Sequence, residues 1–140
     1  MNIATALRTA AEAVLRADAA TVAAFSPSNV RLYPLAAPMP PTFPYGLMLT
    51  DVAGDDTECG EGSEVTLTLE LFAREATYAE SAAKVEAMAG AARKALTKSL
   101  TLTGHVVDDW EFQFDRAVSD PDVLTAHRSV SITYLTSASA

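Results

Sequence analysis

The side chains of this 140-residue chain that could support chemistry are its carboxylates, two histidines and one cysteine. A catalytic nucleophile needs an adjacent base, and that base needs a partner that orients it. The sequence holds no Gly-x-Ser-x-Gly, no phosphate-binding loop and no Gly-x-Gly-x-x-Gly motif. His105 and His127 are therefore interpreted as structural. The acidic residues of the C-terminal third are interpreted as surface charges or turn formers rather than a catalytic pair: Asp108, Asp109, Asp115, Asp120 and Asp122.

A second acidic group falls in a glycine-punctuated segment between two alternating stretches, residues 51–62. Its carboxylates are Asp51, Asp55, Asp56, Glu58 and Glu61. Carboxylate oxygens suit calcium, but this spacing does not match the Asp-x-Asp-x-Asp-Gly pattern of an EF-hand. Cys59 has acidic neighbours, which disfavour a reactive thiolate. The segment is predicted to be a solvated hairpin loop, with neither a metal nor a cofactor.

The overall composition argues for a folded protein that does not grip nucleic acid. The chain is 49% hydrophobic and 20% charged, which is typical of a globular domain, and we assign residues 1–140 to one domain. Its net charge of −8 lacks the clustered Lys and Arg that neutralise phosphates. No apolar run reaches the roughly 20 residues that span a bilayer. The first residues lack a signal-peptide pattern, so synthesis in the cytoplasm is expected.

The strongest structural pattern lies between residues 62 and 100. Residues 64–71 alternate strictly between polar and apolar side chains, which predicts a half-buried strand. Its polar face carries Glu64, Thr66, Thr68 and Glu70. The period then changes to that of an amphipathic helix over residues 78–96. Because neither element carries a catalytic motif, this unit is interpreted as scaffold.

The remaining elements surround this unit. A helix begins near Asn2 and continues or restarts through residues 18–25, and strands are predicted at 30–35, 45–52, 105–115 and 126–135. In the strand predicted at 105–115, Trp110, Phe112 and Phe114 are expected to face the core. The order α-β-β-β-α-β-β predicts an α+β fold, a mainly antiparallel twisted sheet with two helices on one face.

Two parts of this scaffold are candidate contact surfaces. Residues 36–44 hold four prolines and predict an extended, stiff surface arm that includes Pro38, Pro40, Pro41 and Phe43. The uncovered face of the sheet is rich in Thr and Ser. From the residues alone, this face is either a plain solvent surface or a polar subunit contact.

Several motifs occur together in an order that resembles a known family. Val30-Arg31-Leu32-Tyr33-Pro34 precedes the proline arm, and Pro44-Tyr45-Gly46-Leu47-Met48-Leu49 follows it. The acidic loop, the strand at 65–73, a helix, an aromatic strand and His127-Arg128-Ser129-Val130-Ser131-Ile132-Thr133-Tyr134 complete the order. This arrangement is similar to the tail terminator, or tail completion, proteins of long-tailed phages and gene transfer agents, and it covers nearly the whole chain.

The resemblance implies a structural protein of the virion and no catalytic residues. It implies a homo-oligomer, a six-membered ring that caps the tail tube, and contacts with the tail tube protein and with a head-completion or neck protein. It also implies that DNA passes through the ring without sequence-specific binding and that no membrane is involved. The alternatives are another neck or tail component, such as a tail tube or head-completion subunit, and a small cytoplasmic enzyme or ligand-binding domain.

Overall fold

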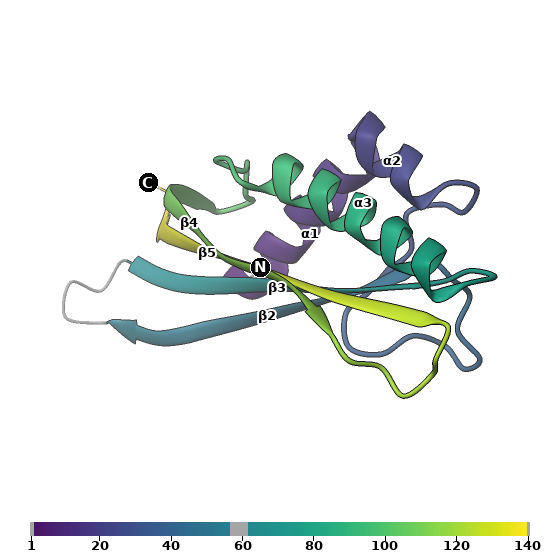
Figure 1. The fold of residues 1–140 in the computed structure, drawn as a ribbon. Helices are drawn as coiled ribbons and strands as arrows, with labels where there is room; N and C mark the ends of the chain where they lie inside the picture. The colour runs from purple at the N-terminus through teal and green to yellow at the C-terminus, as the bar shows by residue number, and fades with distance from the viewer. Residues whose placement is uncertain (1, 57–61, 140) are drawn as a thin grey trace.

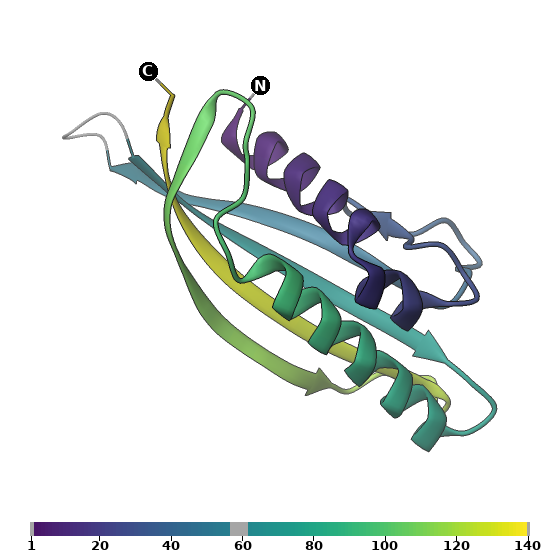
Figure 2. The same ribbon diagram turned by 90° about the horizontal axis from the view of Figure 1, so that it is seen from above.

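The protein folds as a single twisted sheet with helices on one face, in a computed structural model that describes residues 2–56 and 62–139. Figure 1 shows the two layers, and Figure 2 shows α1 and α2 above one half of the sheet and α3 above the other half. The described elements are α1 (Ile3–Ala17), α2 (Ala19–Phe25), β1 (Leu32–Tyr33), β2 (Tyr45–Asp56), β3 (Gly62–Arg74), α3 (Tyr78–Leu96), β4 (His105–Val118) and β5 (Thr125–Ala138).

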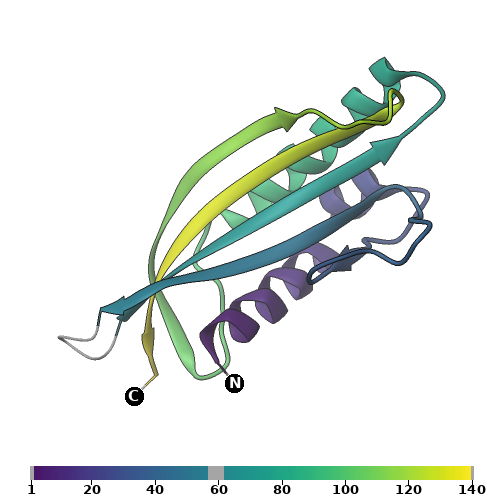
Figure 3. The same cartoon turned by 90° about the horizontal axis from the view of Figure 1, so that it is seen from below.

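The strands lie in the order β1-β2-β3-β5-β4. Three neighbouring pairs are antiparallel, and the short β1 runs parallel to β2, with Leu32 opposite Gly46. The predicted α+β class and the mainly antiparallel sheet are confirmed, with β1 making the sheet mixed. The face opposite the helices, here called the outer face, carries no further layer in the described part of the chain (Figure 3).

The first helical segment restarts instead of continuing, so the described residues contain three helices where two were expected. Asp18 lies in an extended conformation between α1 and α2. Its carboxylate accepts hydrogen bonds from the backbone N–H and the hydroxyl of Thr21. A side-chain oxygen that satisfies an otherwise unpaired N–H is the usual way to begin a helix. Asp18 therefore ends α1 and begins α2.

The core lies between the helices and the inner face of the sheet. The apolar half of β3 supplies four side chains that are at most 1% exposed: Val65, Leu67, Leu69 and Leu71. Val85, Met88 and Ala92 of α3 pack in the same cluster. The alternation of β3 thus buries the residues that the sequence predicted. The helical period of α3 correctly places Val85 and Ala92, but Tyr78 on the same predicted stripe is 51% exposed.

The prediction for β4 is wrong in part. Trp110 lies on the predicted face, opposite the buried Tyr134, but is 37% exposed, and Phe114 lies on the outer face opposite Ser131. Only Phe112 packs against the core as expected. The pairing of β4 with β5 shifts between Val107 and Asp109 and again between Phe112 and Phe114. Each bulge adds a residue, which moves the following side chains to the other face.

The acidic segment also differs from the expectation of a loop over residues 51–62. Strand β2 continues to Asp56 and β3 begins at Gly62, so the acidic residues Asp51, Asp55 and Asp56 belong to a strand. Asp51 is exposed and pairs with Thr66 in the register of the two strands. Glu58 and Glu61 lie outside the described residues.

Candidate interaction surface

A ladder of short polar side chains runs along the outer face between β3 and β5. The two hydroxyl oxygens of Thr66 and Thr133 are 3.0 Å apart, and those of Thr68 and Ser131 are 3.4 Å apart. Ser131 and Thr133 are buried although no layer covers this face in the described part of the chain. Cross-strand pairs of this kind contribute roughly 0.2–1 kcal/mol each and fix the register of the strands. The polar alternation of β3 therefore serves the sheet itself.

Glu70 ends this ladder and binds two side chains of β5. Its Oε2 accepts a hydrogen bond from the Ser129 hydroxyl at 2.6 Å, and its Oε1 lies 2.5 Å from Nε2 of His127. The side chains of Glu70 and His127 are only 20% and 15% exposed. The carboxylate is thus held in one orientation by two neighbours on the adjacent strand.

An aromatic row crosses the outer face beside Glu70, from β1 to β5. The Tyr45 ring stacks on Phe72 with centroids 4.8 Å apart, and Phe72 stacks on His127 at 4.2 Å. Tyr33 and Phe43 contact Tyr45 from the other side, at 6.3 Å and 5.4 Å. Burial, followed by the charge of Asp120, raises the pKa of Tyr45. The row is a rigid, partly apolar strip at one end of a polar face.

The side chains of this face do not form a nucleophilic site. Ser129 and His127 both engage Glu70, whereas a serine nucleophile needs its hydroxyl hydrogen-bonded to the imidazole that takes its proton. Two aspartates of the C-terminal third also have structural partners. Asp115 binds Arg128, and Asp122 binds Arg74. The hydroxyl of Thr125, followed by Arg74, lowers the pKa of Asp122.

The described ranges, 2–56 and 62–139, contain neither a metal-binding cluster nor a helix that could span a membrane. Nowhere in these ranges do three or more His, Cys, Asp or Glu side chains gather so that they could hold a metal ion. Within the same ranges, no helix has the length and apolar character that a membrane span requires.

The proline arm returns to the sheet instead of extending away from it. Phe43 joins the aromatic row, and its carbonyl accepts a weak 3.4 Å hydrogen bond from the Ser28 hydroxyl. Pro44 is buried, while Pro38 and Pro40 are exposed and Pro41 is half-buried. Met39 at the tip is 84% exposed and Leu35 is 78% exposed. The arm thus presents apolar side chains at the β1 edge of the sheet.

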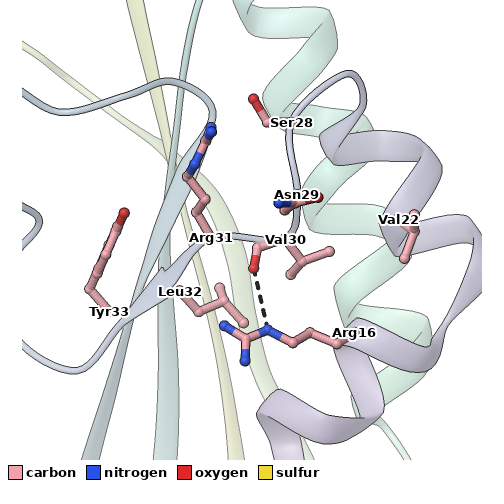
Figure 4. Close-up of a pocket in the computed structure, with 8 residues that line it drawn as sticks. All are labelled: Arg16, Val22, Ser28, Asn29, Val30, Arg31, Leu32 and Tyr33. Carbon is pink, nitrogen blue, oxygen red and sulfur yellow. Dashed lines mark hydrogen bonds between the residues drawn. The ribbon is translucent and has the colours of Figure 1, made fainter.

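Hollows toward opposite edges of the sheet carry opposite charge. Between α1 and β1, two adjoining hollows share Leu32 and Tyr33, and together they are called the arginine groove. Arg16 and Arg31 line the wider hollow, and Arg8 lines the narrower one. Figure 4 shows the wider part, where the Arg16 guanidinium reaches the carbonyl of Val30. Another hollow opens on the outer face toward β4 and has three carboxylates in its lining: Glu64, Asp109 and Glu111.

The structure brings together only some of the predicted contact residues. Glu64, Thr66, Thr68 and Glu70 share the outer face of β3 with Asp51 beside them on β2, as the alternation predicted. Phe43 reaches the same face through Tyr45, and Pro38, Pro40 and Pro41 lie on the neighbouring arm. The sequence reasoning missed the aromatic row, although the alternation of β3 places Phe72 on the face of Glu70. It also missed the arginine groove, for which only the Arg-x-Tyr-Pro motif gave a signal.

A match to a protein family gives the class to which this protein belongs. Residues 4–137 match the protein family described as "Tail completion protein gp17". The chain belongs to this tail completion family, and it is a virion protein associated with the tail.

Solved structures share the fold. A chain in the virion of a native gene transfer agent particle superposes with a TM-score of 0.79 and 22% identity, over 96% of this chain and 97% of that one. The bacteriophage SPP1 gp17 protein superposes with a TM-score of 0.54 and 17% identity, over 94% of this chain and 88% of the other. Comparison with curated protein sequences gives no match.

Proposed function

We propose that this protein is a tail terminator, a non-enzymatic subunit whose ring caps the tail tube and joins the finished tail to the head or neck. The observation that carries the proposal is the match to the tail completion family over residues 4–137. The similarity to a chain of a gene transfer agent virion, which extends over nearly the full length of both chains, supports it.

The partners follow from this role. Copies of the same chain form the ring, which we propose to be hexameric, the tail tube protein lies on one side, and a head-completion or neck protein lies on the other. Two different patches on each subunit are needed for head-to-tail contacts around a closed ring. The open outer face and the exposed arm are further distinct surfaces, available for contacts with the tube and neck partners.

The acidity of the chain suits a passage for DNA. With a net charge of −8, the subunit repels the phosphate backbone over a Debye length of about 8–10 Å. DNA then crosses the ring during ejection without sequence-specific binding. Asp51 and the other acidic residues of the 51–62 segment are proposed to lie at the tube or the lumen.

The role is tested by deleting the gene in a producing cell and imaging the particles by electron microscopy. A terminator predicts tails of irregular, excessive length that are not joined to heads, and restoration of normal particles by the intact gene. Absence of any tail tube would identify a tube subunit instead. Tails of normal length beside heads that lose their DNA would identify a head-completion subunit.

The 51–62 segment is tested separately in the same cells. Replacing Asp51, Asp55 and Asp56 with Asn removes charge without shortening the strand. The proposal expects fewer DNA-filled, joined particles. Unchanged tail length and unchanged head joining would remove this segment from the contact surface.

A further inference from the structure

We infer that the arginine groove between α1 and β1 binds the β4 edge of a second copy of this chain, through ion pairs with Asp109 and Glu111. This inference deepens the proposed ring, on which it rests, by naming the two surfaces that meet. It concerns residues outside the polar ladder and outside the proline arm.

The groove has arginine side chains that are not satisfied within the subunit. Arg8 is half-buried and has no ion pair or hydrogen bond to any other described residue. The Nη1 atom of Arg31 is buried and has no hydrogen-bond partner among the described residues. A buried donor that lacks a partner destabilises the free subunit. The one carboxylate in the lining, Glu12, already binds Arg16 at 2.7 Å. The groove therefore has more guanidinium donors than acceptors.

The hollow beside β4 has the opposite imbalance. Glu64, Asp109 and Glu111 line a space of about 230 Å³, and the lining includes no Lys or Arg. No ion pair joins these three carboxylates to another described residue. Trp110 and Leu135 lie at the same hollow and are 37% and 44% exposed. Carboxylates that lack a cationic partner suit a guanidinium, which can donate two parallel hydrogen bonds to one acid.

One subunit cannot join these two surfaces to each other. The groove adjoins β1 and the hollow lies toward β4, at opposite ends of the order β1-β2-β3-β5-β4. At a strand spacing of about 4.8 Å, those edges are roughly 19 Å apart. The charges are thus complementary only between different copies. A contact between two unlike patches repeats head to tail, which is the geometry that closes a ring.

The contact is made by side chains and not by continuation of the sheet. The two bulges in β4 interrupt the regular series of backbone donors and acceptors along this edge. Bulges of this kind prevent a straight strand from pairing there. Asp109 and Glu111 nevertheless lie on the same face of the bulged strand, opposite Leu135 and Thr133, so both carboxylates face the same side.

Charge reversal on each surface tests the inference, with the mass of the purified protein measured by size-exclusion chromatography and light scattering. The double variant Asp109→Lys, Glu111→Lys and the double variant Arg8→Glu, Arg16→Glu are each expected to fall from the mass of the ring to the 14.8 kDa monomer. Mixed in equal amounts, the two variants are expected to form a ring again, because alternating copies restore every ion pair.

Matched controls reverse equal numbers of exposed charges elsewhere. Glu75→Lys with Glu86→Lys, and Lys94→Glu with Lys98→Glu, are expected to remain rings. Circular dichroism on all variants confirms that the fold is retained. A ring that persists in both groove and edge variants, or variants that stay monomeric when mixed, would overturn this contact while leaving the proposed function intact.

A wild-type chain that stays monomeric at every concentration would overturn both the ring and this contact. The wild type could also bind double-stranded DNA. If the double variant Arg8→Glu, Arg16→Glu lost this binding but kept the ring, the groove would be a phosphate-binding site instead. The four results are distinguishable from one another in the same set of purified proteins.

Discussion

The hydroxyl of Tyr134 in β5 donates a 2.6 Å hydrogen bond to the carbonyl of Leu96, the last residue of α3. Burial raises the pKa of Tyr134 well above its ordinary value, so the hydroxyl keeps the proton that it donates. The last carbonyls of a helix have no partner within the helix. This bond therefore ties the end of α3 to the sheet.

Tyr134→Phe is expected to lower the free energy of unfolding by about 1–3 kcal/mol, because the buried carbonyl of Leu96 loses its donor. Urea denaturation followed by circular dichroism measures the change. Tyr78→Phe is the matched control, since Tyr78 is 51% exposed. Equal stabilities of the two variants would show that the bond contributes nothing.

The ladder on the outer face predicts coupling between Thr66 and Thr133. Thr66→Val or Thr133→Val alone leaves one hydroxyl without its partner, at an expected loss of about 1 kcal/mol. The double variant is expected to lose less than the sum, because both polar groups are removed together. A double-mutant cycle in urea measures this coupling. Strictly additive losses would mean that the 3.0 Å contact is not a stabilising hydrogen bond.

The cap at Asp18 predicts a specific dependence on pH. Hydrogen bonds from the hydroxyl and then the backbone of Thr21 lower the pKa of Asp18 below its ordinary value of about 3.9. A lowered folded-state pKa stabilises the fold above the ordinary value, and that stabilisation is lost as the pH falls through the lowered pKa. Asp18→Ala should therefore unfold at lower urea than the wild type at pH 7, with the difference shrinking below about pH 4.

Asp18→Asn is the informative comparison for this cap. Asparagine also caps helices but does not titrate. At pH 7, the free energy of unfolding of Asp18→Asn should be closer to that of the wild type than that of Asp18→Ala is. In acid, Asp18→Asn should not show the loss of stability that protonation of this carboxyl causes in the wild type. A constant difference between wild type and Asp18→Ala from pH 7 to pH 3 would contradict the ionised cap.

Two glycines give opposite predictions for the same substitution. A Cβ at Gly46 would lie 2.9 Å from one methyl carbon of Leu32 and one of Leu71, so Gly46→Ala should destabilise by about 1–3 kcal/mol and loosen β1. A Cβ at Gly90 in α3 meets nothing within 4 Å. Gly90→Ala should stabilise by up to about 1 kcal/mol. Thermal unfolding of both variants compares them, and a shift of the same sign in both would be inconsistent with these contacts.

Local patterns predicted most of the fold. The strict alternation of β3 placed its buried residues correctly, because this strand buries one continuous face. The helical period of α3 placed most of its buried side, but Tyr78 at the first turn is 51% exposed. In β4 the same reasoning failed for Phe114, which follows the second bulge. A bulge depends on how two strands pair, here β4 and β5, so it cannot be predicted from the sequence of one strand alone.

The contact surfaces were less predictable for a similar reason. Glu70 and Phe72 belong to one strand, and their shared face follows from alternation. Their partners His127 and Tyr45 come from β5 and β2, so the aromatic row depends on the strand order. Likewise, Arg8 and Arg31 lie 23 positions apart in the sequence and meet at one groove because β1 packs beside α1.

The bulges of β4 have a further consequence for the free subunit before assembly. A long, straight and flat edge is a template for cross-β growth, in which identical strands stack into fibrils. Here the edge of a 14-residue strand is interrupted at two places, and the intervening segment carries Asp109 and Glu111. Unassembled copies can therefore accumulate in a crowded cell at low risk of forming amyloid along β4.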